Sequence, residues 1–93
     1  MRTIEYTGQF KKDFKREMKG RHSESLEGDL RAVLDLLGTD AALPERYKDH
    51  GLSGRLRGFR DCHVKPDLVL IYRKSDDETL QLVRLGSHSE LGL

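Results

Sequence analysis

The 93-residue sequence predicts a small α+β domain in which a two-helix hairpin packs on a mostly antiparallel, twisted sheet. Two patterns predict this class. Apolar residues recur at helical spacing between residues 10 and 37, and strand-like alternation or continuous apolar runs fill residues 55–85. The expected element order is β-α-α-β-β-β, within a single domain that spans residues 1–93.

The first third of the chain predicts a short strand and two helices. Residues 3–6 alternate in character, and Thr7 can cap a helix with the apolar stripe Phe10, Phe14 and Met18. Gly20 ends that helix, and Ser23 can cap the next one. The second helix ends at Gly38, and its apolar face consists of Leu26, Leu30, Val33, Leu34 and Leu37. We expect the two helices to form an antiparallel hairpin.

The remaining chain predicts a loop followed by strands. Residues 41–54 contain a proline and two glycines and are expected to form the loop. Residues 55–60 alternate basic and apolar side chains, which is typical of a strand with one basic face, and the next four residues continue it or pair with it. The apolar run 68–72 indicates a central strand covered on both faces. After a polar turn, residues 79–85 predict a last strand, and residues 86–93 a turn and short tail.

Composition excludes several classes of protein. One cysteine excludes an intramolecular disulfide framework and a Cys-rich zinc site. No apolar run approaches the ~18–20 residues of a membrane span, and the N-terminus lacks a signal-peptide pattern. We therefore expect a cytoplasmic protein with no membrane partner.

The net charge of +1 results from cancellation between segments of opposite charge. Residues 1–21 carry seven Lys and Arg against three acids, and residues 51–74 carry six against two. Residues 22–50 and 75–93 are acidic. Two interpretations stay open: the basic segments form a surface for a polyanion, or they are the solvated faces of ordinary amphipathic elements.

Three of the four histidines, namely His50, His63 and His88, lie in loops or at strand ends, where proteins often present catalytic side chains. Two or three histidines with an arginine suit metal-independent RNA transesterification, in which one group removes the 2′-hydroxyl proton and another protonates the leaving 5′-oxygen. Composition alone leaves two alternatives: a zinc site that includes Asp67, or ordinary surface histidines. His22 is expected to be an ordinary histidine, and Cys62 a buried small hydrophobe.

Several segments together resemble the YafQ-type toxins of the RelE superfamily. The resemblance rests on residues 4–10 followed by Lys12-Asp13, on residues 47–52, on residues 58–72 and on residues 84–91. The joint occurrence of the KDH loop, the RDxHxxPD stretch and the terminal GSH is more specific than any one of these motifs.

The resemblance implies a RelE-like fold and a bacterial type II toxin. Such a toxin is a ribosome-dependent endoribonuclease that cleaves mRNA in the ribosomal A site without a metal or other cofactor and inhibits translation. The implied partners are the 70S ribosome, mRNA and a cognate antitoxin, expected to be of the ribbon-helix-helix type. DNA is reached only indirectly, through the antitoxin complex.

The resemblance also implies the site residues. The matching catalytic positions are His50, His63, Asp67, Arg84 and His88. We expect the first three to position and deprotonate the attacking hydroxyl, His88 to act as the general acid, and Arg84 to contact the phosphate. Substrate binding is assigned to the neighbouring bases Lys48, Arg55, Arg57, Arg60 and Lys65.

Two positions depart from the family pattern. Leu68 stands where close relatives carry Trp, and Gly92 stands where they carry Phe. An aromatic side chain there would stack on a base, which is worth ~1–3 kcal/mol. Either Tyr72 or Phe59 stacks instead, or activity is reduced. The alternative function is therefore a catalytically weakened toxin homologue that acts mainly as the antitoxin-binding partner in an autoregulatory repressor complex.

Overall fold

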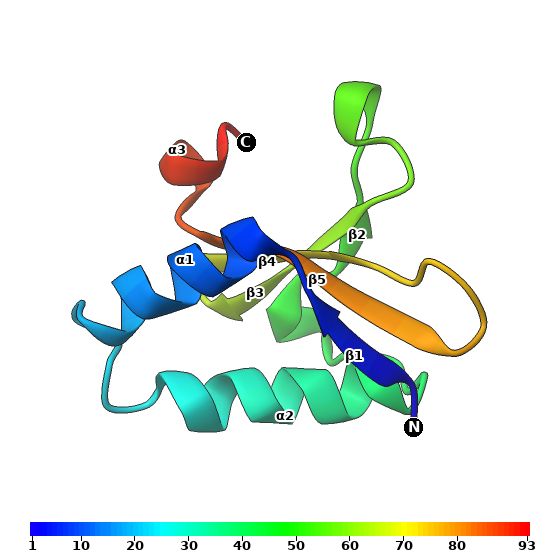
Figure 1. Ribbon diagram of the computed structural model, residues 1–93, viewed down its shortest axis with the longest axis horizontal. Helices are drawn as coiled ribbons and strands as arrows, with labels where there is room; N and C mark the ends of the chain where they lie inside the picture. Colours follow the sequence, from blue (N-terminus) through cyan, green and yellow to red (C-terminus); the bar gives the residue numbers. More distant parts are fainter.

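The computed structural model describes residues 1–93 and confirms the α+β class, with helices packed on a five-stranded sheet (Figure 1). The strands are β1 (Thr3–Tyr6), β2 (His50–Gly51), β3 (Arg60–Lys65), β4 (Leu68–Arg73) and β5 (Thr79–Gly86). The helices are α1 (Gly8–Met18), α2 (Leu26–Gly38) and α3 (His88–Leu91). No helix has both the length and the apolarity needed to cross a membrane.

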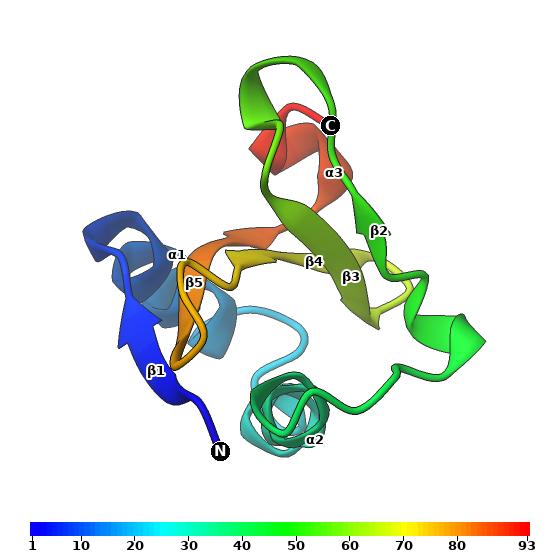
Figure 2. The same cartoon turned by 90° about the vertical axis from the view of Figure 1, so that its right-hand side faces the viewer.

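The sheet has the strand order β1-β5-β4-β3-β2. β1 pairs with β5 in parallel, and all the other pairs are antiparallel. The apolar run predicted as a central strand forms β4, in which every residue from Leu68 to Tyr72 is buried. Figures 1 and 2 show α2 beneath the sheet, whereas α3 and the segment after β2 stand above it.

Strand alternation gives the sheet two different faces. The face toward α2 carries the main core, in which side chains of the sheet meet those of the helices; from the strands it includes Cys62, Val64, Leu70, Tyr72, Leu80, Leu82 and Leu85. Because successive strand residues point to opposite faces, Asp61, His63 and Ile71 lie on the other side. We call this second side the site face.

Helix α1 covers the part of β5 that β1 leaves unpaired. β1 pairs only with Thr79–Leu82. Beyond that point, the Thr7 hydroxyl donates to the Val83 carbonyl at 2.7 Å, and the Asp13 carboxylate accepts from the Leu85 N–H at 3.0 Å. Thr7 also accepts from the Phe10 N–H at 3.0 Å, which confirms the predicted helix cap. Side chains of a helix thus replace a neighbouring strand along this edge.

The strand predicted for residues 55–60 is wrong. Gly54 and Gly58 adopt φ angles of +67° and +94°, a region that suits glycine, and Gly54–Leu56 form a 3₁₀ turn. β3 therefore begins only at Arg60. The segment predicted as a loop contributes the short strand β2, which pairs with β3. The alternation of basic and apolar residues predicts a strand, but the two glycines adopt backbone angles that a strand does not allow.

Two helix starts also differ from the sequence prediction. The second helix begins at Leu26 with Ser25 at its N-cap, two residues beyond the predicted cap Ser23. The tail contains the short helix α3, whose first turn is closed by reciprocal hydrogen bonds between Ser87 and Glu90. The Ser-x-x-Glu pattern of residues 87–90 is the local sequence signal for this helix start.

Candidate active site

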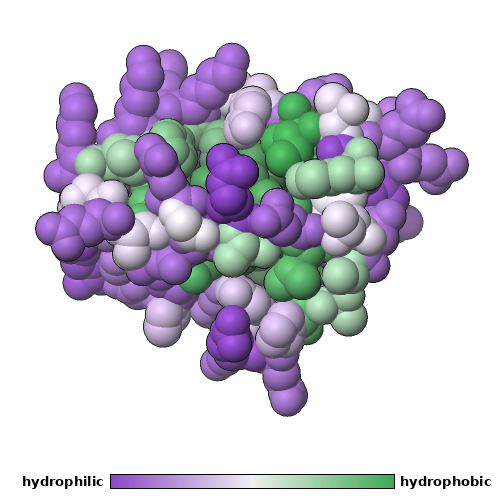
Figure 3. Space-filling model, turned by 90° about the horizontal axis from the view of Figure 1, so that it is seen from below, coloured by the Kyte–Doolittle hydropathy of each residue, from purple (hydrophilic) through white to green (hydrophobic).

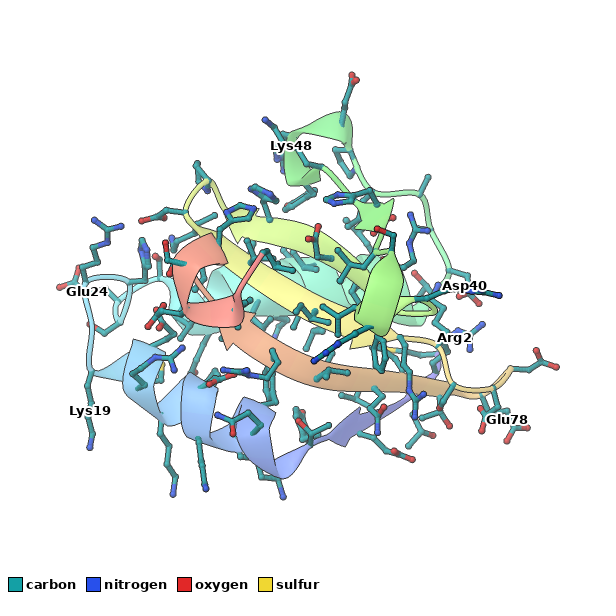
Figure 4. The ribbon with its side chains drawn as sticks, turned by 90° about the horizontal axis from the view of Figure 1, so that it is seen from above. Arg2, Lys19, Glu24, Asp40, Lys48 and Glu78 are labelled. Carbon is teal, nitrogen blue, oxygen red and sulfur yellow. The ribbon has the colours of Figure 1, made fainter.

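The site face brings His50, His63 and His88 together around a buried aspartate. His63 projects from β3, His88 is the first residue of α3, and His50 comes from β2 at the sheet edge. Asp61 lies two residues before His63 on the same strand, so both side chains share this face. Figure 4 shows this side of the sheet, with α3 over one end and the segment after β2 over the other.

His63 and His88 form the closest histidine pair. Their ring centroids are 5.0 Å apart with the planes tilted by 57°. The Nδ1 atom of His63 lies 3.3 Å from the Pro66 carbonyl oxygen. Because a carbonyl can only accept, this hydrogen bond places a proton on Nδ1 and leaves Nε2 of the neutral ring free to take one. The pair therefore offers two proton-transfer groups within reach of one small substrate group.

Asp61 is the residue of this candidate site that the sequence analysis did not single out. It is 1% exposed, and its Oδ1 atom lies 3.0 Å from Nδ1 of His50, within ion-pair distance but without hydrogen-bond alignment. Burial raises the pKa of the Asp61 carboxyl, and the charges of the three surrounding histidines oppose that rise. An acidic residue at i−2 from a histidine on a strand was the available signal.

His50 is held from two sides. Its Nδ1 atom lies 3.0 Å from the Lys48 carbonyl oxygen as well as 3.0 Å from Asp61. Lys48 ends a 3₁₀ turn with a φ of +50°, a left-handed conformation. The backbone turn before β2 and the buried carboxylate together hold the His50 ring at the edge of the site.

Asp67 does not join the histidine cluster. Its Oδ1 atom lies 3.1 Å from Nε2 of His22, and its other oxygen accepts from Arg21. Both partners belong to the connection between α1 and α2, which thereby contacts the β3–β4 turn. His22 thus lies within ion-pair distance of Asp67, and its side chain is only 18% exposed.

Arg84 lies on the site face in one row with Asp61. It pairs across the strands with Ile71 of β4, and Ile71 pairs with Asp61 of β3. Two strand spacings of about 4.8 Å each separate the ends of this row. The Arg84 guanidinium donates from Nε to Asp13 at 2.7 Å and from Nη2 at 3.3 Å, and its Nη1 has no protein partner.

The five predicted substrate-binding bases fall into two groups. Lys48, Arg55 and Arg57 are exposed, and Lys48 projects beyond the sheet in Figure 4. Arg60 instead pairs with Asp49 at 3.1 Å. Lys65 donates to Ser25 Oγ at 2.6 Å and pairs with Asp29, so it contacts the α2 side. Only the first group keeps its charge free for a polyanion.

The remaining candidates have defined places. Burial raises the pKa of the Cys62 thiol to about 12, so the thiol stays neutral in the core, as the sequence predicted. Tyr72 is 2% exposed and Leu68 1%, so neither side chain can stack on a base. Phe59 is half-buried, with the Arg73 guanidinium 5.2 Å above its ring. No group of three His, Cys, Asp or Glu side chains is arranged to hold a metal ion.

A family model described as "Bacterial toxin of type II toxin-antitoxin system, YafQ" matches residues 2–92. The mRNA interferase toxin YafQ of Escherichia coli (strain K12) is 44% identical over 91 residues, covering 97% of this chain and 95% of that protein.

Two solved structures are similar over almost the whole chain. The crystal structure of YafQ from E. coli strain BL21(DE3) has a TM-score of 0.84 at 41% identity, covering 98% of each chain. The YafQ chain in a crystal structure of the E. coli DinJ-YafQ complex has a TM-score of 0.82 at 42% identity, again over 98% of each chain.

These matches and the fold define a toxin of the bacterial type II toxin–antitoxin class. The chain belongs to the YafQ toxin family. The resemblance drawn from its motifs is confirmed, and so is the expected arrangement of helices on a mostly antiparallel sheet.

The raised pKa of Asp61 gives a pH dependence that can be tested. A carboxyl whose pKa is higher in the folded than in the unfolded chain stabilises the fold below its unfolded pKa, about 3.9, and this contribution is lost as the pH rises through the folded pKa. The free energy of unfolding of the wild type, relative to Asp61→Asn, is therefore expected to fall as the pH rises from 3 to 7. Urea unfolding across this range measures it.

Asp76→Asn is the matched control. Hydrogen bonding from the Glu78 backbone N–H lowers the pKa of Asp76, so the wild type is expected to gain stability over this variant as the pH rises. A wild-type advantage over Asp61→Asn that grows with pH would contradict the assignment for Asp61.

Proposed function

We propose that this chain is an mRNA interferase, an endoribonuclease that cleaves mRNA in the ribosomal A site and thereby inhibits translation. The observation that carries the proposal is the meeting of His63 and His88, from β3 and α3, at 5.0 Å beside buried Asp61. The activity named for the E. coli relative, mRNA interferase toxin, supports the substrate class.

The proposed reaction is a transesterification with two proton transfers. His63 takes the proton of the ribose 2′-hydroxyl on its free Nε2, and the 2′-oxygen attacks the adjacent phosphorus. The bond to the 5′-oxygen breaks, and His88 gives that oxygen a proton. The products are a 2′,3′-cyclic phosphate and a 5′-hydroxyl. His63 has then gained one proton and His88 has lost one, and no metal is needed.

The other residues stabilise or orient these groups. Arg84 offers its unpaired Nη1 to the phosphate, whose negative charge grows in the transition state. His50 and Asp61 form the edge of the site beside His63. Because Asp67 is bound by Arg21 and His22, we assign it an orienting role through the β3–β4 turn and not the role of the base.

The ribosome is proposed to supply most of the affinity for mRNA. The chain has a formal net charge of only +1, so free RNA gains little from long-range attraction. The predicted substrate-binding bases that keep a free charge, Lys48, Arg55 and Arg57, are few and exposed. A scaffold that holds the mRNA in place would supply the orientation that such a surface does not.

One specific observation favours the alternative of a weakened toxin. Leu68 and Tyr72 are both buried, so of the two aromatic residues expected to stack on a base only half-buried Phe59 is left. A chain that binds its antitoxin but cleaves slowly would still serve in a repressor complex. An assay for cleavage of ribosome-bound mRNA separates the two functions.

Expression of the chain without an antitoxin is expected to arrest growth, and His88→Ala is expected to abolish the arrest. Removal of a general acid typically lowers the rate by about 10²–10⁴-fold. Primer extension on ribosome-bound mRNA is expected to show new 5′ ends within the coding region for the wild type and none for the variant.

Ser89→Ala is the control, because Ser89 is exposed on the same short helix and its side chain makes no hydrogen bond. If His88→Ala is as toxic as Ser89→Ala, the site assignment is wrong. If the wild type arrests no growth and leaves no new ends, the weakened homologue is the better description.

An antitoxin is the second proposed partner, and an apolar groove supports a place for it. The groove lies between α1 and α2 beside β1, and it measures about 770 Å³, enough for several apolar side chains. Seen from the α2 side, hydrophobic residues gather in the middle of this face among hydrophilic ones (Figure 3). The apolar lining consists of Met1, Ile4, Tyr6, Phe10, Phe14, Leu30 and Leu34.

The charges on the two walls of the groove favour a binding partner with a matching distribution of charge. The α1 wall carries Lys11 and Lys15, which form no ion pairs, whereas the α2 wall carries Glu27 and Asp35 around Arg31. We propose that an amphipathic helix of the antitoxin occupies the groove with its acidic flank toward α1. The ribbon-helix-helix type of that antitoxin, and contact with DNA through it, stay predictions from the family resemblance.

Lys11→Glu/Lys15→Glu is expected to weaken binding of the antitoxin encoded beside the toxin gene by about tenfold or more, because two attractive contacts become repulsive. Isothermal titration with the purified proteins measures it. Lys12→Glu/Lys19→Glu changes the net charge equally at exposed positions outside the groove, in α1 and at its C-cap, and is expected to have much less effect. Equal losses, or no loss, would show that the antitoxin does not use this groove.

A further inference from the structure

We propose that Asp13 and Arg16 of α1 are positioning residues, which hold Arg84 and the first turn of α3 in the geometry that cleavage requires. Neither residue faces the substrate in this arrangement. The inference rests on the function proposed above and deepens it, because it assigns to α1 a role in the reaction. Three sets of contacts carry it.

The Asp13 carboxylate is completely buried and fully hydrogen-bonded. Its donors come from two elements: Gln9 and Arg16 of α1 at 3.2 and 3.0 Å, and the Leu85 N–H and the Arg84 guanidinium of β5 at 3.0 and 2.7 Å. A carboxylate has about four acceptor sites, so this set uses its capacity. Although burial raises the pKa of Asp13, hydrogen bonds from Arg84 and Leu85 outweigh burial and keep the group ionised.

The contacts with Asp13 leave Arg84 with one orientation. Nε and Nη2 both donate to the carboxylate, a side-on arrangement that fixes the plane of the guanidinium. Nη1 has no protein partner, and the side chain is 31% exposed on the site face. Arg84 therefore loses little further freedom when it contacts a phosphate, which is the advantage of a preorganised charge.

Arg16 extends the same network to α3. It donates from Nη2 to the Leu85 carbonyl at 2.8 Å, and its Nε lies 3.3 Å from Glu90. Glu90 in turn accepts from the Ser87 N–H at 2.9 Å and closes the capping box at the start of α3. His88 is the first residue of that helix, so its backbone position follows from this contact.

Gly86 shows how closely Arg16 packs against the end of β5. A Cβ atom at Gly86 would lie 2.9 Å from Nη2 of Arg16 and 3.3 Å from Glu90. The strand end thus has no room for a side chain while Arg16 is in place. The packing of Arg16 over Gly86 joins α1, β5 and α3 at the point where both Arg84 and His88 are placed.

Burying the Asp13 carboxylate between α1 and β5 carries an unfavourable desolvation free energy. Apolar residues of similar size commonly replace buried ion pairs without loss of stability, and Phe10 already packs α1 into the core. An apolar residue at position 13 would supply neither an acceptor for the Leu85 N–H nor the orientation of the Arg84 guanidinium, and only the second loss concerns the reaction. This distinction separates a positioning role from a merely structural one, and it can be measured.

Asp13→Asn keeps the size of the side chain and an acceptor for the Leu85 N–H but removes the charge that holds Arg84. On ribosome-bound mRNA, we expect the single-turnover rate at saturation to fall by about tenfold or more, with a half-saturating concentration that changes by less than about threefold. Glu17→Gln is the control on the same helix, because it removes the charge of another partner of Arg16 without touching Arg84 or α3. Its rate is expected to stay within about twofold of the wild type.

A double-mutant cycle shows through which residue Asp13 acts. In an Arg84→Ala background, Asp13→Asn is expected to lower the rate by less than about twofold further, because the residue it positions is already absent. A full, multiplicative loss in that background would overturn the proposal. An unchanged rate for folded Asp13→Asn alone would also overturn it.

Guanidinium rescue keeps the proposal testable if Asp13→Asn does not fold. Added guanidinium ion is expected to restore part of the activity of Arg84→Ala, since the Asp13 carboxylate can bind the ion where the side chain was. Arg16→Gln, a change at a half-exposed side chain, is expected to lower the rate while circular dichroism stays unchanged. Absence of rescue together with a wild-type rate for Arg16→Gln would overturn the proposal.

The outcomes also separate this inference from the proposed function. If the wild type cleaves no ribosome-bound mRNA, the proposed function fails. If the wild type cleaves and Arg84→Ala is impaired, but folded Asp13→Asn is not, only the positioning role fails.

Discussion

The structure depends on how the backbone N–H and C=O groups along the unpaired edge of β5 find hydrogen-bond partners. β1 ends at Tyr6, so Val83–Gly86 of β5 have a strand neighbour on only one side. Unpaired backbone groups inside a fold are costly, and α1 pairs them with the side chains of Thr7, Asp13 and Arg16. The helix therefore has to carry polar groups on a face where it meets the sheet. The same polar side chains of α1 contact β5 and, through Arg16 and Glu90, α3, so the three elements meet at the site.

A single irregularity in the sheet decides which face Arg84 occupies. Strict alternation along β5 would place Arg84 on the same face as Leu80 and Leu82, in the core. The register between β4 and β5 shifts between Ile71 and Tyr72, so that Tyr72 pairs with Leu82 whereas Ile71 pairs with Arg84. Leu85 instead joins the core. The bulge thus brings the arginine to the site face without exposing an apolar residue.

Local patterns were sufficient for much of the fold. The stripe of Phe10, Phe14 and Met18, the Thr7 cap and the apolar run that forms β4 each report one element through its own residues. Contacts between distant segments were not predictable in this way. The bulge beside Arg84 and the partners of Asp67 depend on residues far away in the sequence. The histidines were found because their chemistry is rare, whereas Asp61 was passed over as one acidic residue among many.

In the proposed mechanism, a pair of histidines cleaves RNA by activating the 2′-hydroxyl of the RNA itself. Analysis of the ends of mRNA cut on ribosomes tests it most directly, by mass spectrometry of the fragments or by their response to phosphatase and kinase treatment. The expected ends are a 2′,3′-cyclic phosphate, or the 3′-phosphate formed from it, and a 5′-hydroxyl. A 3′-hydroxyl with a 5′-phosphate would contradict the claim, because those ends require attack by water on the phosphorus.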